Sequence, residues 1–369
     1  MRIALLHNHP IHYMHLLFAA IANQGACLDV IFAARSSNQR TTSMLRTGET
    51  YRSHFLSEGS FESLPQFSTA LQAVRVVERC RPDIVIISGY SYLPTWSVLA
   101  WAKCHRKPVV LWFETNQFDQ ARSPAKEMIK RMFVGACDAA HVYGSSNREY
   151  LEFLGMKPAA IIEKRATVDS ALFLKRSPAF HSEFRRFIFV GRFSPEKNVP
   201  RLLDAFQIVR RKSPAELVLI GYGPDEHLLR QQARNLGLDE SVVFAGAMTQ
   251  DGVSQALADS DCLVLPSLSE PWGLVANEAL CSGIPIIVSN QCGCARDLIT
   301  EDSGWIVDPR DPEHMAEAMH KVCMLSVERL QEMGQAALKI AGEYTPEASA
   351  KRIMTSLEGL LAATGRRRG

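Results

Sequence analysis

The sequence predicts an α/β protein with two doubly wound parallel sheets, one in each of two domains. Short apolar runs at 2–6, 84–88 and 262–265 have the length and composition of buried parallel strands, and helical periodicity follows each of them. This alternation is typical of parallel sheets that are covered by helices. The chain has 369 residues, which suits two domains of about 150–180 residues better than one.

The same patterns place the domain boundaries. We expect residues 1–170 to form the first domain and residues 186–345 to form the second. Residues 171–185 have no clean period and are interpreted as the linker. A last helix is expected over residues 346–369, because Thr345-Pro346-Glu347 has the pattern of an N-cap followed by proline at the first helical position.

Residues 35–65 interrupt the alternation within the first domain. This polar stretch has no strong periodicity and carries Arg35, Arg40, Arg46 and Arg52. A long irregular insertion in a compact domain is usually functional or mobile. Two interpretations stay open, an acceptor-binding segment and a solvated flexible loop.

The charge of the chain is uneven. Residues 1–180 carry 21 Lys and Arg against 14 Asp and Glu, whereas the remainder carries 20 against 25. A basic half predicts contact with an anionic membrane or an acidic acceptor. Nucleic acid is not expected, because no basic and aromatic residues interleave on a predicted strand.

One helix of this basic half has the composition of a membrane-surface helix. Between Ala125 and Val134 it places Lys126, Lys130 and Arg131 beside Met128, Ile129, Met132 and Phe133. Such a helix either lies on an anionic membrane or packs on its own sheet. Nine cysteines without regular spacing, and no export signal, predict a cytoplasmic protein, possibly peripheral to the inner face of the membrane.

Residues 262–283 predict an anion-binding strand–turn–helix unit. The strand at 262–265 leads through a polar turn into a helix expected from Pro271, at the first helical position, to Gly283. The first helical N–H groups, Trp272 to Val275, would then point into the turn, where the helix dipole favours an anion. Glu270 and Glu278 flank this turn, and carboxylates accept hydrogen bonds from vicinal hydroxyls. The alternative is a solvated turn carboxylate and a helix-surface carboxylate.

Two cations are expected near this unit. Arg192 and Lys197 follow the strand at 186–190, and Asn198 has the character of an N-cap for the next helix. Cations at a helix start are disfavoured by the dipole, so a bound anion would explain them better than a solvated pair. The Gly-x-Gly turn at Gly221-Tyr222-Gly223 has no third glycine, so it is not a dinucleotide fingerprint.

These ordered motifs, together with Phe244-Ala245-Gly246, resemble those of retaining GT-B glycosyltransferases that use nucleotide sugars (glycosyltransferase family four). The resemblance covers about residues 186–310 and implies two Rossmann-like domains, with the last helix crossing back to the first. It implies transfer of a sugar from a UDP- or GDP-sugar to an acceptor hydroxyl, in glycan, polysaccharide or glycolipid assembly, with no metal or other cofactor. The donor-binding residues expected from it are Gly191, Arg192, Lys197, Gly221, Gly223, Phe244, Ala245, Glu270, Trp272, Gly273, Leu274, Val275 and Glu278.

The resemblance also implies roles. Glu278 would bind the ribose hydroxyls and Glu270 the donor sugar, while Arg192 and Lys197 hold the diphosphate. The backbone near Phe244 would hold the base. A diphosphate that gains charge as it leaves is stabilised by fixed cations and helix N–H groups, so we expect Glu270, Arg192 and Lys197 to be catalytic.

The first domain is expected to bind the acceptor. Asn8, His9 and His12 follow or flank the first strand, and ligands gather at the carboxyl ends of parallel strands. Glu114 follows the apolar strand at 109–113, where the resembled family often has histidine. It is either a catalytic proton or hydrogen-bond acceptor, or a turn carboxylate that caps the next segment.

No metal site is predicted, either at the histidines between His7 and His15 or at Asp259-Ser260-Asp261. Two other functions remain open. A sugar-nucleotide epimerase or hydrolase on the same architecture would need no acceptor. A catalytically silent scaffold would need neither Glu270 nor Glu278.

Overall fold

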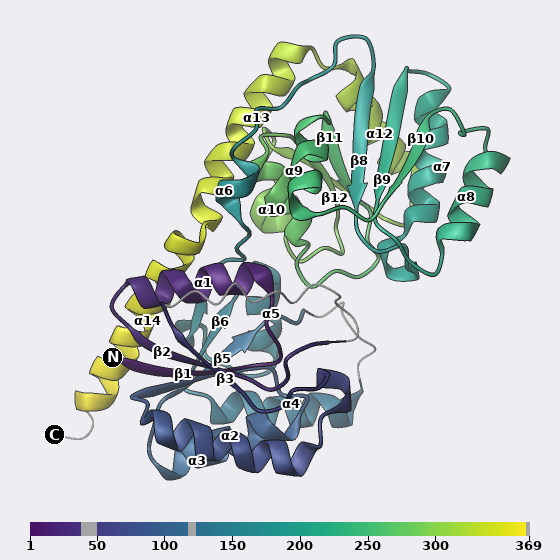
Figure 1. The fold of residues 1–369 in the computed structure, drawn as a ribbon. Coiled ribbons are helices and arrows are strands. Elements are labelled where there is room, and N and C mark those ends of the chain that lie inside the picture. Colours follow the sequence, from purple (N-terminus) through teal and green to yellow (C-terminus); the bar gives the residue numbers. More distant parts are fainter. Residues whose placement is uncertain (38–49, 117–122, 367–369) are drawn as a thin grey trace. The chain divides into compact units, whose positions relative to one another are not determined.

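The computed structural model describes residues 1–37, 50–116 and 123–366 and divides the chain into two units (Figure 1). The first comprises Met1–Thr167 with Pro346–Gly369, and the second comprises Val168–Thr345. The expected linker at 171–185 is therefore part of the second unit. The physical reason is that Phe173 is buried and Phe180 packs against the core of that unit.

The first unit is built on a parallel sheet. In its described residues this sheet has seven strands in the order β3-β2-β1-β4-β5-β6-β7. The strands are β1 (Arg2–His7), β2 (Cys27–Phe32), β3 (Arg52–Phe55), β4 (Ile84–Ser88), β5 (Val109–Phe113), β6 (Ala139–Val142) and β7 (Ile161–Glu163). Strands β3 and β7 were not predicted, because both are short and lie at the sheet edges, and β3 also lacks an apolar run.

Helices cover both faces of this sheet. One face packs on α1 and α14, and the other packs on α2 to α5. Their bounds are α1 (His12–Asn23), η1 (Phe61–Ser63), α2 (Gln66–Cys80), α3 (Leu93–Cys104), α4 (Pro124–Ala136), α5 (Ser145–Phe153), η2 (Pro158–Ala160) and α14 (Pro346–Arg366). Alternate residues of β1 serve the two faces, Ile3 and Leu5 on one and Ala4 and Leu6 on the other, as the period of a strand requires.

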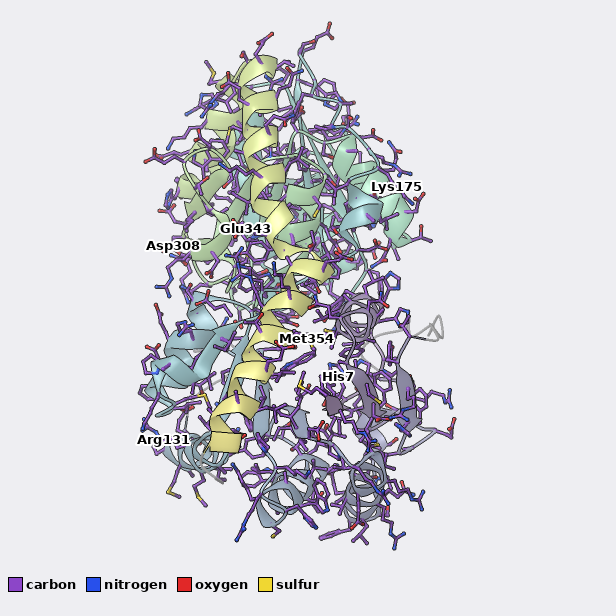
Figure 2. The ribbon with its side chains drawn as sticks, turned by 90° about the vertical axis from the view of Figure 1, so that its left-hand side faces the viewer. His7, Arg131, Lys175, Asp308, Glu343 and Met354 are labelled. Carbon is purple, nitrogen blue, oxygen red and sulfur yellow. The ribbon has the colours of Figure 1, made fainter. Side chains whose placement is uncertain are left out.

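The last helix, α14, packs on the first unit although nearly two hundred residues separate it from β7. Its Ile353, Met354 and Leu357 are buried in the same cluster as α1 (Figure 2). Its Ser356 Oγ lies 3.0 Å from His141 Nε2, and its Ser349 hydroxyl donates to the Lys164 carbonyl. In the part of the chain that the structure describes, no helix combines the length and the apolar composition that crossing a membrane would need.

The second unit repeats the architecture on a six-stranded parallel sheet, counted over its described residues, in the order β10-β9-β8-β11-β12-β13. The strands are β8 (Arg185–Val190), β9 (Ala215–Ile220), β10 (Val242–Gly246), β11 (Cys262–Leu265), β12 (Ile286–Ser289) and β13 (Gly304–Val307). The helices are α6 (Ser170–Phe173), η3 (Pro195–Lys197), α7 (Val199–Arg210), α8 (Glu226–Asn235), α9 (Gln250–Ala258), α10 (Leu274–Cys281), α11 (Ala295–Leu298), α12 (Pro312–Met324), α13 (Val327–Ala341) and η4 (Gly342–Tyr344).

Asp261, the last residue of Asp259-Ser260-Asp261, holds the entry into β8. Its carboxylate is buried and accepts from the backbone N–H groups of His181 and Arg186, at 2.8 and 2.6 Å. His181 Nδ1 lies 3.0 Å from the same group. These contacts fix the entry into β8, so the carboxylate serves the fold.

Candidate functional site

In the second unit, the turn after β8 and the glycine-containing turn after β9 are in close backbone contact. A Cβ added to Gly221 would lie 1.8 Å from the Gly191 carbonyl oxygen, and one added to Gly223 would lie 2.2 Å from the Phe193 carbonyl oxygen. Gly221 also has φ +140°. These two glycines are therefore required for the close approach of the loops, which brings the segment from Gly191 to Lys197 to the carboxyl ends of the strands.

Lys197 and Glu270 form the central pair of this site, although 73 positions separate them in the sequence. The Lys197 ammonium donates to the Glu270 carboxylate, and both side chains are mostly buried, at 19% and 14% exposure. Ser267 Oγ donates to the same carboxylate at 3.4 Å. The two predicted residues therefore meet, but as an ion pair, in which Glu270 balances the charge of Lys197.

Arg192 lies in the same segment but is exposed. Its charge acts on Glu196. Burial by itself would raise the pKa of the Glu196 carboxyl, but hydrogen bonds from Ser194 and the backbone, together with nearby cations, hold that pKa below its usual range.

Asn198 differs from the prediction. It occupies the N-cap position of α7 with φ +58°, but its side chain does not cap the helix. Its Nδ2 instead donates to the carbonyls of Pro266 and Pro309, at 3.1 and 2.7 Å.

The helix after the turn begins at Leu274, three residues later than predicted. Gly273 has φ +98°, a left-handed conformation that cannot belong to the helix, and a Cβ there would lie 2.7 Å from Leu265 Cδ2. Trp272 is buried, and its Nε1 donates to Asn277 Oδ1 at 2.7 Å. The expected first-turn donors are therefore the N–H groups of Leu274 and Val275 alone, and Pro271 and Trp272 shape the turn before them.

Glu278 lies on α10, one turn beyond these N–H groups. Desolvation by burial raises its pKa to about 7, against an ordinary value of 4.5. Its carboxyl makes no hydrogen bond or ion pair with any described residue, and its side chain keeps partial contact with solvent. A desolvated carboxyl without a protein partner is costly unless a ligand supplies donors.

Phe244 and Ala245 lie on the edge strand β10, beside the register shift that ends at Gly246. The Phe244 ring meets Phe193 edge to face at 6.2 Å, and the Arg230 guanidinium lies 4.4 Å from its centroid. Sequence reasoning missed Arg230. Its only sequence signal is a basic residue on the first turns of a helix that follows a Gly-x-Gly turn.

The first unit carries its own cavity, of about 500 Å³, at the carboxyl ends of β1, β4 and β5. Asn8, His9 and Glu114 line it, as predicted for an acceptor side, together with His7 and Trp112. The described lining does not include His12, which lies on α1. The expected acceptor residues are thus only partly brought together.

Glu114 is held by two partners that sequence reasoning did not pair with it. The Tyr143 hydroxyl donates to Glu114 Oε1 at 2.6 Å, and Lys164 Nζ lies 3.5 Å from the same oxygen. Lys164 is fully buried between the rings of Trp112 and Tyr143, 4.3 and 4.2 Å from their centroids. Desolvation lowers its pKa, and Glu114 opposes that shift. A lysine directly after the short strand β7 is the signal that could have found this pair.

Two histidines near this pair are kept neutral. Burial lowers the pKa of His7 to about 4 and that of His141 to about 3. Trp112 Nε1 donates to His141 Nδ1 at 3.1 Å, and His7 Nδ1 lies 3.0 Å from the His9 carbonyl. Neither ring carries a positive charge at neutral pH. His7 lines the cavity, and His141 accepts from Trp112, which also lines it.

Most of the second unit is similar to a known protein family. Residues 172–340 match the family Glycosyl transferases group 1. The chain is 28% identical to the glycogen synthase of Mycobacterium tuberculosis over 253 residues, 66% of this chain and 60% of that protein. It is 30% identical to an uncharacterized glycosyltransferase of Methanocaldococcus jannaschii over 148 residues, 40% and 38% of the two chains. The chain thus spans about half the length of the curated relatives it matches.

Solved structures show the same fold along nearly the whole chain. The sucrose-phosphate synthase of Thermosynechococcus elongatus superposes with a TM-score of 0.77 at 18% identity, covering 98% of this chain and 100% of that one. Anabaena HepE in complex with UDP and glucose gives a TM-score of 0.74 at 18% identity, covering 97% and 100%. The chain therefore has the two Rossmann-like domains of the GT-B fold, and its residues 172–340 match the glycosyl transferases group 1 family.

Proposed function

We propose that this chain is a retaining, metal-independent glycosyltransferase, in which the second unit binds a UDP- or GDP-sugar and the first binds the acceptor. The observation that carries the proposal is the meeting of Lys197 and Glu270 beside the start of α10. The family of residues 172–340 and the GT-B fold support it. Two solved structures of Anabaena HepE that share the fold, bound to UDP with glucose and to UDP-glucose, agree with a nucleotide-sugar donor.

In the proposed reaction the bond from the anomeric carbon to the diphosphate oxygen breaks, and a bond to the acceptor oxygen forms on the same face. The diphosphate oxygen gains negative charge as its bond to the sugar breaks, and it takes the proton that the acceptor hydroxyl gives up. Lys197, Arg192 and the N–H groups of Leu274 and Val275 would stabilise that charge without a metal. Release of Lys197 from Glu270 would free the carboxylate for the donor sugar.

Glu278 would accept hydrogen bonds from the ribose hydroxyls. Its carboxyl is desolvated and has no described protein partner, so two hydroxyl donors would offset the cost of its ionised form. Nucleotide binding should then lower its pKa, and affinity should rise as pH increases through about 7.

Glu114 would orient the acceptor in the cavity of the first unit. Tyr143 and Lys164 hold its carboxylate in one orientation while 40% of the side chain stays exposed. An acceptor hydroxyl could donate to the exposed part. We assign Glu114 to this role in preference to the capping of the next segment.

The exposed face of α4 supports a second part of the proposal, contact between the first unit and an anionic membrane. Lys130 and Phe133 are buried, but Met128, Ile129 and Met132 are 48–64% exposed. Beside them, the Arg131 guanidinium lies 4.8 Å from the ring of the exposed Phe153 (Figure 2). Exposed apolar side chains next to cations are the composition of a surface that inserts among anionic lipids.

The deciding experiment has two stages. A thermal-shift screen in EDTA against UDP, GDP, ADP and dTDP selects the base, since a ligand at 100 times its Kd adds about 2.7 kcal/mol. The matching nucleotide sugars are then incubated with sugar and lipid acceptors, and the product's anomeric configuration is read by NMR. Product formed without any acceptor would indicate an epimerase or hydrolase. Nucleotide binding with no turnover would indicate a silent scaffold.

Glu278→Gln is the variant for the binding stage. It should lose the nucleotide-induced shift, whereas Glu317→Gln, an exposed carboxylate on α12, should keep it. Equal shifts in both variants would remove Glu278 from the nucleotide site.

A further inference from the structure

A cluster of metal-ligating side chains lies in the first unit, away from the acceptor cavity. Asp29, His54 and Cys80 each offer one ligand atom, and these atoms all lie within 4.8 Å of one another. They come from β2, β3 and α2, and they line a separate cavity of about 410 Å³. Arg2 at the start of β1 lines this cavity, whereas His7 at the end of β1 lines the acceptor cavity. The two cavities therefore lie at opposite ends of one parallel sheet.

The distances within the cluster suit a small tetrahedral ion. Asp29 Oδ1 is 2.8 Å from His54 Nε2, and His54 Nε2 is 3.9 Å from Cys80 Sγ. Around zinc, bond lengths of about 2.0–2.3 Å in a tetrahedron place neighbouring ligand atoms about 3.3–3.8 Å apart. The observed distances bracket that range, so small side-chain movements would suffice.

Cys27 lies outside this group of three, but it lines the same cavity and is the candidate for a fourth ligand. It lies two residues before Asp29, so both side chains point from the same side of β2. Arg52 Nη2 donates to both of them, at 3.0 Å to Cys27 Sγ and 2.6 Å to Asp29 Oδ2. Because Arg52 uses Oδ2, the other oxygen of Asp29 stays directed at His54.

The charges select the kind of ion. Three arginines, Arg2, Arg52 and Arg79, line the cavity against one carboxylate, so an added divalent charge would be repelled. A divalent ion that displaces the thiol protons of Cys27 and Cys80 adds two positive charges and removes two. The net charge of the cavity therefore stays the same. Ions that prefer oxygen ligands, such as Mg²⁺ and Ca²⁺, cannot use that exchange.

We propose that Cys27, Asp29, His54 and Cys80 form a structural site for Zn²⁺ or a similar thiophilic divalent ion, with Arg52 balancing its charge. The ion would join three elements. Strand β3 is four residues long, lies at the sheet edge and has the polar sequence Arg-Ser-His-Phe, so few apolar contacts hold it. Ligation would fix β3 to β2 and to the end of α2. This inference is independent of the sugar-transfer proposal.

The test uses the full chain without an affinity tag, reduced and stripped with EDTA, and Co²⁺ as the probe. One equivalent of Co²⁺ should bind and give a thiolate-to-cobalt charge-transfer band with the visible spectrum of a tetrahedral site. Zn²⁺ should abolish the band, and excess Mg²⁺ or Ca²⁺ should not. An unmodified chain that shows no thiolate band overturns the proposal, whatever its variants do.

Three variants assign the ligands. Cys80→Ser and His54→Ala should each weaken Zn²⁺ binding by ~100-fold or more, since even supporting residues of metal sites contribute 10–100-fold. Cys27→Ser should reduce the intensity of the charge-transfer band by about half, because it removes one of two thiolates. The matched control is Cys104→Ser, an exposed cysteine at the end of α3, which should bind as the unmodified chain does. If Cys80→Ser binds Zn²⁺ as tightly as Cys104→Ser, the cluster is only a hydrogen-bonded ion pair and the proposal fails.

Discussion

The two units place ionisable groups at the carboxyl ends of their strands, but they satisfy them differently. In the first unit, Glu114 is held by Lys164 and Tyr143, and His141 lies between Trp112 and Ser356. In the second unit, Glu278 has no described partner, and Lys197 donates to Glu270. The first unit is therefore preorganised by its own side chains, whereas the second is arranged so that a charged ligand completes it.

The two units also differ in how their stability depends on pH. An unfolded histidine binds a proton below about pH 6.5, whereas the pKa values of His7 and His141 are about 4 and 3 in the fold. The unfolded chain then binds more protons, so the first unit loses stability as pH falls below about 6.5. The raised pKa of Glu278, about 7, has the opposite sign, because the folded carboxyl keeps a proton that the unfolded one releases near 4.5. Its contribution to stability is lost as pH rises from about 4.5 through 7.

The largest effect should come from the second unit. Lys197→Ala removes one of the two cations that we propose stabilise the leaving diphosphate, so turnover should fall by ~10³-fold, the scale of losing one oriented charge or donor. Turnover with the selected nucleotide sugar is measured with and without EDTA. Lys321→Ala, on the exposed side of α12, is the control and should be normal. Normal activity in Lys197→Ala, or a requirement for Mg²⁺ or Mn²⁺ in the unmodified chain, would contradict the proposed role.

In the first unit, Glu114→Gln should lower turnover by ~10²-fold and keep nucleotide affinity. It also leaves the buried Lys164 without its charge partner, so the free energy of unfolding should fall by about 1–3 kcal/mol, reduced from the fully buried case because Glu114 is 40% exposed. The double variant Glu114→Gln/Lys164→Met should recover stability but not turnover. Recovery of both would mean that Glu114 acts only through folding.

The opposite pH responses can be separated with Glu278→Gln. At pH 8 this variant should raise the free energy of unfolding of the second unit by about 2 kcal/mol, because it removes a desolvated ionised carboxylate. At pH 5, where Glu278 is protonated, the change should be small. Hydrogen exchange of peptides from α10 measures both values, with Glu317→Gln as control. The same gain at both pH values would show that protonation of Glu278 is not the cause.

The smallest expected effect concerns the membrane face of the first unit. Met128→Ser/Met132→Ser should reduce co-sedimentation with phosphatidylserine vesicles by ~10-fold at low salt, because two exposed apolar side chains are lost. Leu71→Ser, an equally exposed change on α2, should have no effect. If the unmodified chain co-sediments equally with anionic and neutral vesicles, this part of the proposal fails.

The sequence by itself determined the repeated strand–helix pattern of both units, because buried parallel strands are continuous apolar runs and the helices between them keep a 3.6-residue period. It also singled out Glu270, Glu278, Arg192 and Lys197, because they flank predicted strand–turn–helix anion sites and match motifs of the resembled glycosyltransferases. The edge strand β3 was not predicted, because its sequence Arg-Ser-His-Phe has no apolar run. This strand is held in place by pairing with β2.

Only the tertiary structure decided how these residues are paired. Lys197 meets Glu270 and Lys164 meets Glu114 across 73 and 50 positions, and no local pattern encodes which charge is opposite which. The start of α10 was likewise set by tertiary contact, since Gly273 must be left-handed where it passes Leu265. The cluster of Asp29, His54 and Cys80 forms for the same reason. Strand pairing and helix packing bring distant positions together, whereas sequence periodicity reports only which face of its own element a residue occupies.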